Sequence, residues 1–266
     1  MIELLALDVD GTLIDEALSI PDRVREAVLE VHEQGVTVTL ATGRMLESTT
    51  PFARELEIDA PLICYQGGLI QAPNAPEPLY RATMDRDVVR DALAWRVEQG
   101  WHAVLYADDA LFIAERRYPE SFYRGLLGEN LHQVDKLIGV LEHREPVKFL
   151  FIADPPEADR IERAMRQRFG GRVEIVRSHA NFVEANPLGV SKGDALRRLA
   201  DHLGVPQTRV MAVGDQGNDV PMLEWAGISV AMGNASSEAK AAADWIAPPF
   251  SEHGAAVAIE RFILDA

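Results

Sequence analysis

The strongest constraint on the fold is a regular alternation of apolar strand-like segments with helix-like segments over the first 65 residues. Ile2–Val9, the β-branched run Val36–Ala41 and Leu62–Tyr65 have the composition of buried strands. Between the first two, Pro21–Gln34 has apolar residues at helical spacing, and a second helix is expected after Arg44. Because strands joined through helices run parallel, this alternation predicts a parallel sheet with helices on its faces.

The same alternation returns after Ser191, which indicates that both ends of the chain contribute to one core. The expected elements in this part are a helix, a strand, a helix, a strand and, after one more helix, a short strand: Lys192–Leu203, Val210–Val213, Val220–Trp225, Ile228–Ala231 and Trp245–Ile246. Gly214 and Gly233 each follow a predicted strand, where the chain must turn.

The segment between these two parts has a different pattern. It mixes helices with paired strands: helices at Asp87–Gln99, near Pro119 and at Glu157–Phe169, and strands at His102–Tyr106, Leu111–Ala114, Lys148–Ala153, Val173–Arg177 and Phe182–Glu184. The pair Asp108-Asp109 between the first two strands predicts a hairpin. We therefore expect an α/β protein in which residues 1–83 and 187–266 form the core and residues 84–186 form an inserted α+β domain.

Composition excludes some partners. The formal net charge of −16 argues against a nucleic-acid or anionic-membrane surface, but not against a small anionic substrate bound locally. The single cysteine, Cys64, rules out an internal disulfide and lies in a predicted buried strand. No apolar run approaches the ~20 residues of a spanning helix, and the first residues do not resemble a secretory signal. We therefore expect a cytoplasmic protein of a reducing compartment.

The first motif with chemical content is Asp8-Val9-Asp10-Gly11-Thr12-Leu13, at the end of the first predicted strand. Parallel α/β sheets place ligand sites at the carboxyl ends of their strands. One carboxylate there can attack phosphorus, and the other can act first as general acid and then as base. Two carboxylates two residues apart also suit a divalent metal. An ordinary Asp/Gly turn is the alternative if this motif is taken alone.

Two further motifs offer phosphate contacts. Thr42 and Gly43, after the second predicted strand, provide a hydroxyl and approachable N–H groups, although Thr42 would serve equally well as a helix cap. Lys192 opens a predicted helix, where a lysine is normally solvated. In a phosphate site it would neutralise charge and hold the nucleophile.

The fourth motif is Gly214-Asp215-Gln216-Gly217-Asn218-Asp219, which follows the strand Val210–Val213. Its two acids and its amide offer the oxygen ligands that Mg²⁺ prefers. Each motif alone has a commonplace explanation. All four in order, mostly at strand ends, are poorly explained by chance.

The four motifs occur in the order Asp-x-Asp-Gly-Thr, Thr-Gly-Arg, Lys-Gly and Gly-Asp-x-x-Asn-Asp. This series resembles the Cof-type, subclass IIB branch of the haloacid dehalogenase superfamily of phosphohydrolases. The resemblance covers nearly the whole chain and implies a Rossmann-like parallel-sheet core, an α+β cap that closes over the site, and sugar-phosphatase-like activity. One departure is visible: many relatives have Asn-Gly after the third strand, whereas this chain has Gln66-Gly67-Gly68. Any substrate contact made there is therefore in doubt.

The resemblance also implies roles for individual residues. Asp8 would be the nucleophile and Asp10 the general acid and base, with Lys192 supporting the reaction. Mg²⁺ would be bound by Asp8, the backbone carbonyl of Asp10 and Asp215, with Asp219 supporting the metal site. The phosphate would be held by these four residues: Thr42, Gly43, Lys192 and Asn218.

The expected activity is Mg²⁺-dependent hydrolysis of a small phosphomonoester through an aspartyl phosphate. A phosphomutase of the phosphomannomutase type and a non-catalytic phosphometabolite sensor remain as alternatives. Sugar phosphates are the default substrate, with flavin mononucleotide and pyridoxal phosphate also open, and the oligomeric state is not readable. Polar or aromatic candidates for substrate contact in the cap are Trp101, His102, Tyr106, Arg117, His179, Asn181 and Glu184.

Overall fold

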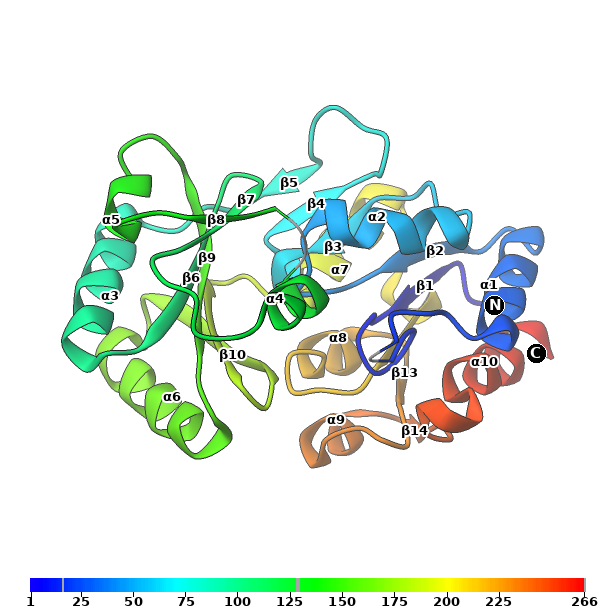
Figure 1. The fold of residues 1–266 in the computed structure, drawn as a ribbon. Helices are drawn as coiled ribbons and strands as arrows, with labels where there is room; N and C mark the ends of the chain where they lie inside the picture. The colour runs from blue at the N-terminus through cyan, green and yellow to red at the C-terminus, as the bar shows by residue number, and fades with distance from the viewer. Residues whose placement is uncertain (16, 128–129, 266) are drawn as a thin grey trace. The chain divides into compact units, whose positions relative to one another are not determined.

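The chain folds into two units, which we describe separately (Figure 1). The computed structural model describes residues 1–15, 17–127 and 130–265. The first unit comprises Met1–Arg81 and Ser191–Ala266, and the second comprises Ala82–Val190. Within the described part of the chain, every helix is too short or too polar to serve as a membrane-crossing segment.

In the first unit, strands and helices alternate along most of the sequence. Its N-terminal part has β1 (Leu4–Leu7), α1 (Asp22–Glu33), β2 (Thr37–Leu40), α2 (Leu46–Glu55), β3 (Leu62–Cys64), η1 (Tyr65–Gly67), β4 (Leu69–Gln71) and β5 (Tyr80–Arg81). Its C-terminal part has α7 (Lys192–Leu203), η2 (Gln207–Arg209), β12 (Val210–Gly214), α8 (Val220–Trp225), β13 (Ile228–Ala231), α9 (Ser237–Ala242), β14 (Trp245–Ile246), η3 (Phe250–Glu252), α10 (Gly254–Ile259) and η4 (Glu260–Leu264).

A five-stranded parallel sheet forms the centre of this unit, in the order β14-β13-β12-β1-β2. All four residues of β1 are buried, as expected for a central strand covered on both faces. Helix α1 buries Val24, Ala27, Val28 and Val31, whose spacing places them on one face. This helix contacts α10, and α7 contacts α8. The predicted α/β core with a parallel sheet is therefore confirmed.

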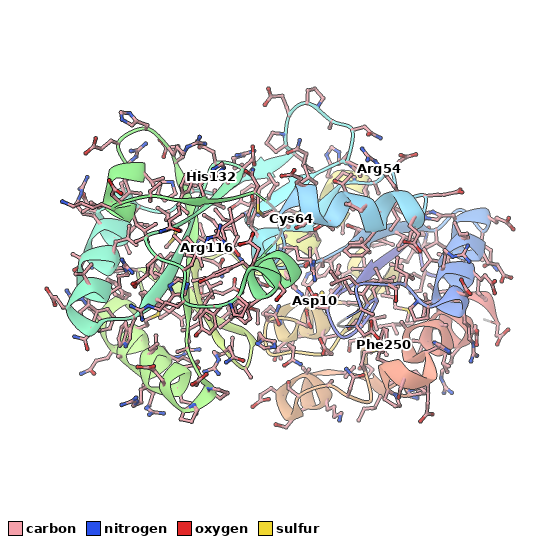
Figure 2. The ribbon with its side chains drawn as sticks, in the orientation of Figure 1. Asp10, Arg54, Cys64, Arg116, His132 and Phe250 are labelled. Atoms are coloured by element: carbon pink, nitrogen blue, oxygen red, sulfur yellow. The ribbon has the colours of Figure 1, made fainter. Side chains whose placement is uncertain are left out.

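The third predicted strand differs from our expectation. Residues 62–65 were expected to extend the parallel sheet, but β3 pairs antiparallel with β4, in a separate sheet of order β3-β4-β5. A single parallel bridge, between Ala41 and Ile63, connects β3 with the end of β2. The chain reverses because Tyr65 and Gln66 both adopt left-handed conformations, with φ of 52° and 60°. Cys64 is buried at the end of this strand, as predicted (Figure 2).

The second unit mixes strands with helices in the following order: α3 (Arg86–Gln99), β6 (His102–Ala107), β7 (Ala110–Ile113), α4 (Glu120–Leu127), β8 (Leu131–Gln133), α5 (Leu137–Val140), β9 (Pro146–Ile152), α6 (Pro155–Phe169), β10 (Val173–His179) and β11 (Phe182–Pro187). Its sheet has the order β10-β11-β9-β6-β7-β8 and is antiparallel except between β7 and β8. The predicted hairpin is present, since Ala107 pairs with Ala110 around Asp108-Asp109.

The two faces of this second sheet carry different side chains. Leu105, Phe149 and Val183 point into an apolar core that also includes residues of α3 and α6. Alternate residues point to the opposite face, where Lys148 and Glu184 form a buried ion pair with an N–O distance of 2.7 Å. The second unit therefore has a hydrophobic core of its own.

Candidate active site

Asp8 follows directly after β1, the strand at the centre of the parallel sheet. Its backbone N–H donates to the carbonyl of Val213 on β12, so the first residue beyond β1 is still held by the neighbouring strand. Leu7 lies opposite Val213 in the register, which brings the residues after both strands to the same edge of the sheet. The side chain of Asp8 is buried.

Lys192 connects two of the predicted site residues. Its Nζ donates to Oδ1 of Asp8 at 2.5 Å and to Oδ1 of Asp219 at 2.6 Å. Ser191 caps the helix that Lys192 opens, because its hydroxyl accepts a hydrogen bond from the N–H of Asp194. The lysine is therefore not solvated but buried between two carboxylates.

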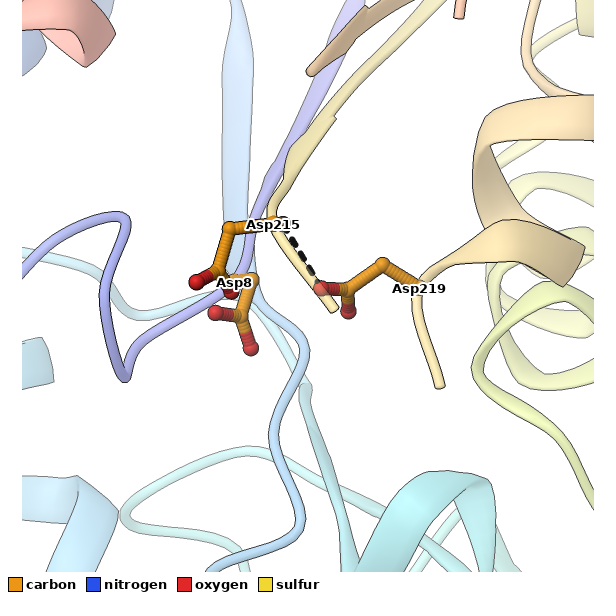
Figure 3. Close-up of side chains that lie close together, drawn as sticks. All are labelled: Asp8, Asp215 and Asp219. Carbon is orange, nitrogen blue, oxygen red and sulfur yellow. Dashed lines mark hydrogen bonds between the residues drawn. The ribbon is translucent and has the colours of Figure 1, made fainter. Parts of the chain in front are cut away.

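Asp219 uses both of its oxygens within the site. While Oδ1 accepts from Lys192, Oδ2 accepts from the backbone N–H groups of Asp215 and Gln216, both at 2.9 Å. Asp219 thereby shapes the loop that follows β12 and fixes the position of Asp215 (Figure 3).

One oxygen of Asp215 is buried without a hydrogen-bond partner in the described part of the chain. Its Oδ2 accepts from Gln216 Nε2 at 3.0 Å and lies 3.5 Å from Asn234 Nδ2, whereas the buried Oδ1 has no hydrogen-bond partner among the described residues. Gly11 makes this approach possible, because a Cβ at that position would lie 2.4 Å from Oδ2 of Asp215.

The three aspartates fit a divalent cation. One ligand oxygen from each of Asp8, Asp215 and Asp219 lies within 4.8 Å of the other two, and all three residues are buried (Figure 3). Lys192 provides one positive charge for three carboxylates, so an excess of negative charge remains. The unsatisfied Oδ1 of Asp215 and the all-oxygen donor set are features that a magnesium site requires.

The electrostatics reflect this crowding of buried acids. Burial raises the pKa of Asp8 well above its usual range, and the charge of Asp219 raises it further against the opposing effect of Lys192. Burial, followed by the charge of Asp219, raises the pKa of Asp215 to about 7. Burial alone would lower the pKa of Lys192, but the carboxylates of Asp219 and Asp8 outweigh it and raise that pKa.

Asp10 is not one of the three mutually close aspartates, but its negative charge contributes to raising the pKa of both Asp8 and Asp215. Its carboxylate is half-exposed and binds the guanidinium of Arg44, with Nε and Nη2 donating over distances of 2.6 to 3.1 Å. Arg44 is itself largely buried and lies over the ring of Phe52. In this structure the Asp10 carboxylate is therefore bound by Arg44, and the expected roles of its carboxyl group and its backbone carbonyl stay predictions.

Thr42 and Gly43 lie in the loop after β2. The Thr42 hydroxyl accepts from the N–H of Arg44 at 3.1 Å, so it closes a local turn rather than capping α2, which begins at Leu46 after Met45. A Cβ on Gly43 would lie 2.4 Å from Nε2 of Gln66. The backbone at Gly43 is thus packed closely against Gln66.

Asn218 also contacts that residue. Its Nδ2 donates to Oε1 of Gln66 at 2.9 Å, and its buried Oδ1 has no hydrogen-bond partner among the described residues. Asn218 and Gly43 belong to different motifs, and the amide of Gln66 reaches both.

Sequence reasoning missed several contacts in this unit. The ion pair between Arg44 and Asp10 was not expected, although Arg44 belongs to a motif that we had singled out. Asn234 was also missed: its Nδ2 donates to the carbonyl of Gly11 at 3.0 Å and approaches Asp215. Its position directly after Gly233, beyond a predicted strand, is a signal that could have drawn attention to it.

Most of the expected contact residues of the second unit have structural partners. Trp101 packs against Trp95 and Phe151 of the apolar core, and Arg117 binds Glu115 and the carbonyl of Gly100. Asn181 Nδ2 donates to the carbonyl of Ala153. These contacts favour structural roles for all three.

The remaining candidates lie on or beside the opposite face of the second sheet. The Nε2 atom of His102 is 2.9 Å from the hydroxyl of Tyr123, and burial lowers the pKa of His102 to about 4. Lys148, paired with Glu184, lies 4.5 Å from the ring centre of Tyr106. His179 is exposed and lies beside Phe182.

Comparison with known proteins identifies the family. Residues 5–259 match the family described as haloacid dehalogenase-like hydrolase. The chain is 30% identical to a 5-amino-6-(5-phospho-D-ribitylamino)uracil phosphatase of Bacillus subtilis, with 99% of this chain and 96% of that protein covered. It is also 30% identical to an HMP-PP phosphatase of an Enterobacter species, over 88% of this chain and 85% of the other.

A solved structure is similar over the same extent. A haloacid dehalogenase-like hydrolase from Bacteroides thetaiotaomicron superimposes with a TM-score of 0.85 at 29% identity, covering 99% of this chain and all of that one. With its motifs, its fold and relatives that are named phosphatases, the chain belongs to the haloacid dehalogenase superfamily, Cof type, and is a phosphatase.

Proposed function

We propose that this phosphatase hydrolyses small phosphate monoesters through a phosphorylated Asp8, with Mg²⁺ as cofactor. The observation that carries the proposal is the buried contact of 2.5 Å between Asp8 and Lys192, within a cluster of three carboxylates at the ends of parallel strands. A buried nucleophile beside the fixed positive charge of Lys192, at the edge of the sheet where ligands bind, is suited to attack on a phosphate.

The cation would be held by Asp8 and Asp215, with Asp219 orienting the loop that presents Asp215. Among the oxygens of these aspartates, Oδ1 of Asp215 is buried and has no hydrogen-bond partner among the described residues. Both oxygens of Asp219, in contrast, accept hydrogen bonds. When bound, Mg²⁺ supplies positive charge that favours ionised Asp8 and screens the phosphate dianion.

The first chemical step would transfer the phosphoryl group to Asp8. Lys192 binds Oδ1 of Asp8, which leaves Oδ2 to attack phosphorus in line with the departing oxygen. As the bond from phosphorus to that oxygen breaks, Asp10 donates a proton to it. Asp10 is half-exposed, and this role requires it to exchange its ion pair with Arg44 for a proton and a contact with the departing oxygen.

The second step would release phosphate. Asp10, now a carboxylate, takes a proton from a water molecule whose oxygen attacks phosphorus. The bond between phosphorus and Asp8 breaks, inorganic phosphate leaves, and Asp8 is restored. Lys192 stays beside Asp8 throughout and stabilises its negative charge. Thr42, Gly43 and Asn218 are the proposed contacts of the phosphate oxygens.

The substrate is proposed to be a small phosphorylated metabolite, with sugar phosphates as the leading class. The relative from Bacillus subtilis is named for a phosphorylated ribityl compound, which supports an ester of a polyhydroxylated chain. We propose that the second unit acts as the cap and supplies contacts to the leaving group. A cytoplasmic location, as expected from the sequence, belongs to the same proposal. Phosphate release should be measured over a panel of sugar phosphates, flavin mononucleotide and pyridoxal phosphate, with and without Mg²⁺.

Hydrolysis is favoured over the mutase alternative because the named relatives are phosphatases. A mutase would instead convert a sugar phosphate to its isomer without net release of phosphate. Both products should be followed in the same assay.

The substitution Asp8→Asn tests the nucleophile. It should lower kcat by at least about 1,000-fold, since an amide cannot form the acyl phosphate. Circular dichroism and thermal unfolding should show a retained fold, because asparagine has the same shape. Asp201→Asn, an exposed substitution on α7, is the matched control and should leave turnover unchanged. Full activity in Asp8→Asn would remove Asp8 as nucleophile.

A further inference from the structure

Gln66 occupies an unusual place in the first unit. It is buried, at 2% exposure, in the short turn η1 between β3 and β4. Both Tyr65 and Gln66 have left-handed backbone conformations, which residues other than glycine adopt at a cost in free energy. Strain of this kind persists only where the surroundings hold it in place, so the contacts of this turn need an explanation.

The backbone of the turn is fixed to the loop that contains Thr42 and Gly43. The N–H of Tyr65 donates to the carbonyl of Arg44, and the N–H of Gln66 donates to the carbonyl of Thr42, both at 3.0 Å. These two hydrogen bonds fix the turn relative to that loop, and thereby fix the backbone position from which the Gln66 side chain extends.

The side chain of Gln66 then reaches two of the proposed phosphate contacts. Its Oε1 accepts from Asn218 Nδ2 at 2.9 Å, and its Nε2 lies so close to Gly43 that a Cβ there would be 2.4 Å away. One amide therefore connects the loop after β2 with the loop after β12.

The next residue of the turn touches a third part of the site. A Cβ on Gly67 would lie 2.2 Å from the carbonyl oxygen of Ser191, the residue that caps α7 immediately before Lys192. The turn is thus in contact with the segments that carry Gly43, Lys192 and Asn218, although none of these is its neighbour in sequence.

We infer that Gln66 is a positioning residue that orients the amide of Asn218 toward the phosphate. The hydrogen bond occupies one N–H of Asn218 Nδ2 and turns the second N–H in a fixed direction. Asparagine at this position would be one methylene shorter, and we expect it not to reach both Gly43 and Asn218. This inference rests on the proposed function, since it takes Asn218 as a phosphate contact.

A double-mutant cycle tests the inference. The variants are Gln66→Met, Asn218→Ala and their combination, and the probe is inorganic phosphate titrated by calorimetry in the presence of Mg²⁺. Gln66→Met keeps the length of the side chain but removes its acceptor. It should raise the dissociation constant of phosphate about 5- to 10-fold, the size expected for one buried hydrogen bond. With p-nitrophenyl phosphate as substrate, KM should rise more than kcat falls.

The combined variant should bind phosphate as Asn218→Ala does, within a factor of two, because Gln66 acts through Asn218. The control is Gln71→Met on β4, which removes the hydrogen bond to the carbonyl of Ala75 in the same small sheet. It should leave phosphate binding unchanged. If Gln66→Met does not fold, Gln66→Asn replaces it in the cycle, with the same expected dependence on Asn218.

The outcomes separate this inference from the proposed function. If the wild-type protein neither binds phosphate nor releases it from p-nitrophenyl phosphate, the proposed function fails. If the wild type does both but Gln66→Met behaves like Gln71→Met, Gln66 is a packing residue only. Independent, multiplying effects of Gln66→Met and Asn218→Ala would likewise overturn the inference.

Discussion

At the scale of single residues, Lys192 compensates part of the negative charge of the buried aspartates in the site. Its ammonium group is buried between Asp8 and Asp219, and Asp215 adds a third buried acid nearby. Removing one partner of a buried ion pair leaves charge uncompensated and costs roughly 3–5 kcal/mol. Here two carboxylates would lose their partner together.

We therefore predict that Lys192→Met lowers the free energy of unfolding by at least about 3 kcal/mol without metal, and by less in excess Mg²⁺. A bound cation would replace part of the missing positive charge. Urea unfolding of both proteins in a chelator and in Mg²⁺ measures this difference. Lys240→Met, on α9, is the control and should cost little in either condition. An equal loss with and without Mg²⁺ would argue against a cation at the three aspartates.

Asp215 leads to a prediction about pH. Its pKa in the folded protein, about 7, lies above the usual value of 3.8. A raised folded pKa stabilises the protein fully below pH 4, and that contribution is lost as the pH rises through about 7. The metal-free protein should therefore lose stability over this interval, whereas its affinity for Mg²⁺ should rise, because the cation displaces the proton.

Thermal unfolding in a chelator at pH 5 and pH 8, together with calorimetric Mg²⁺ titrations, measures both effects. Asp215→Asn isolates the contribution of this carboxyl group and should flatten both pH dependences. Identical pH profiles in wild type and Asp215→Asn would show that another group is responsible.

At the scale of elements, the site depends on the close packing of the turn η1 against the start of helix α7. Gly67 has a φ of +102° and no room for a Cβ, which would lie 2.2 Å from the carbonyl oxygen of Ser191. Gly35, after α1, has a similar φ of +78° but open space around it. Alanine substitutions at the two glycines therefore distinguish the cost of backbone strain, which both share, from the cost of displacing α7, which only Gly67 adds.

We predict that Gly35→Ala costs about 1 kcal/mol of stability and leaves turnover unchanged. Gly67→Ala should cost clearly more, and should lower kcat at least about 10-fold because the start of α7 must shift with Lys192. Urea unfolding and steady-state kinetics of the two variants provide the comparison. Equal effects on turnover would mean that the contact with Ser191 does not position Lys192.

The sequence predicted some elements closely and others not at all. Helices α7 and α8 and strands β13 and β14 have the expected bounds. Ser191 and Gly204 cap the two ends of α7, and β13 and β14 are short apolar runs. The antiparallel sheet β3-β4-β5 was not foreseen, since it depends on a reversal at two left-handed residues, Tyr65 and Gln66, neither of which is a glycine. Local propensity carries no signal for such strained positions.

The same distinction applies to the site. Residues at strand ends, such as Asp8 and Asp215, could be singled out because parallel topology brings those ends together. The contacts between Arg44 and Asp10, or between Gln66 and Asn218, could not, because they depend on where long side chains meet across segments distant in sequence. Spacing along a chain does not contain that information.

At the scale of the whole molecule, each unit has a sheet and a core of its own. The second unit buries apolar residues from β6, β7, β9, β10 and β11 and from α3, α5 and α6. The partly buried Trp95 and Trp101 pack against this core in a ring cluster with Phe151 and Phe169. Its six-stranded sheet is formed entirely by strands between Ala82 and Val190. A segment of about 100 residues with a continuous core is large enough to fold independently.

We therefore predict that residues 82–190, produced alone, unfold cooperatively in urea and show near-ultraviolet circular dichroism from the packed tryptophans. Phe151→Ala in this fragment should lower its free energy of unfolding by roughly 3–5 kcal/mol, because the ring lies at the centre of the cluster. Exposed Val97→Ala serves as its control and should change little. A fragment that lacks cooperative unfolding would show that its core requires the first unit. Independent folding would explain how a domain can be inserted within one chain without disrupting the sheet in which β1 pairs with both β2 and β12 and which positions Asp8 and Asp215.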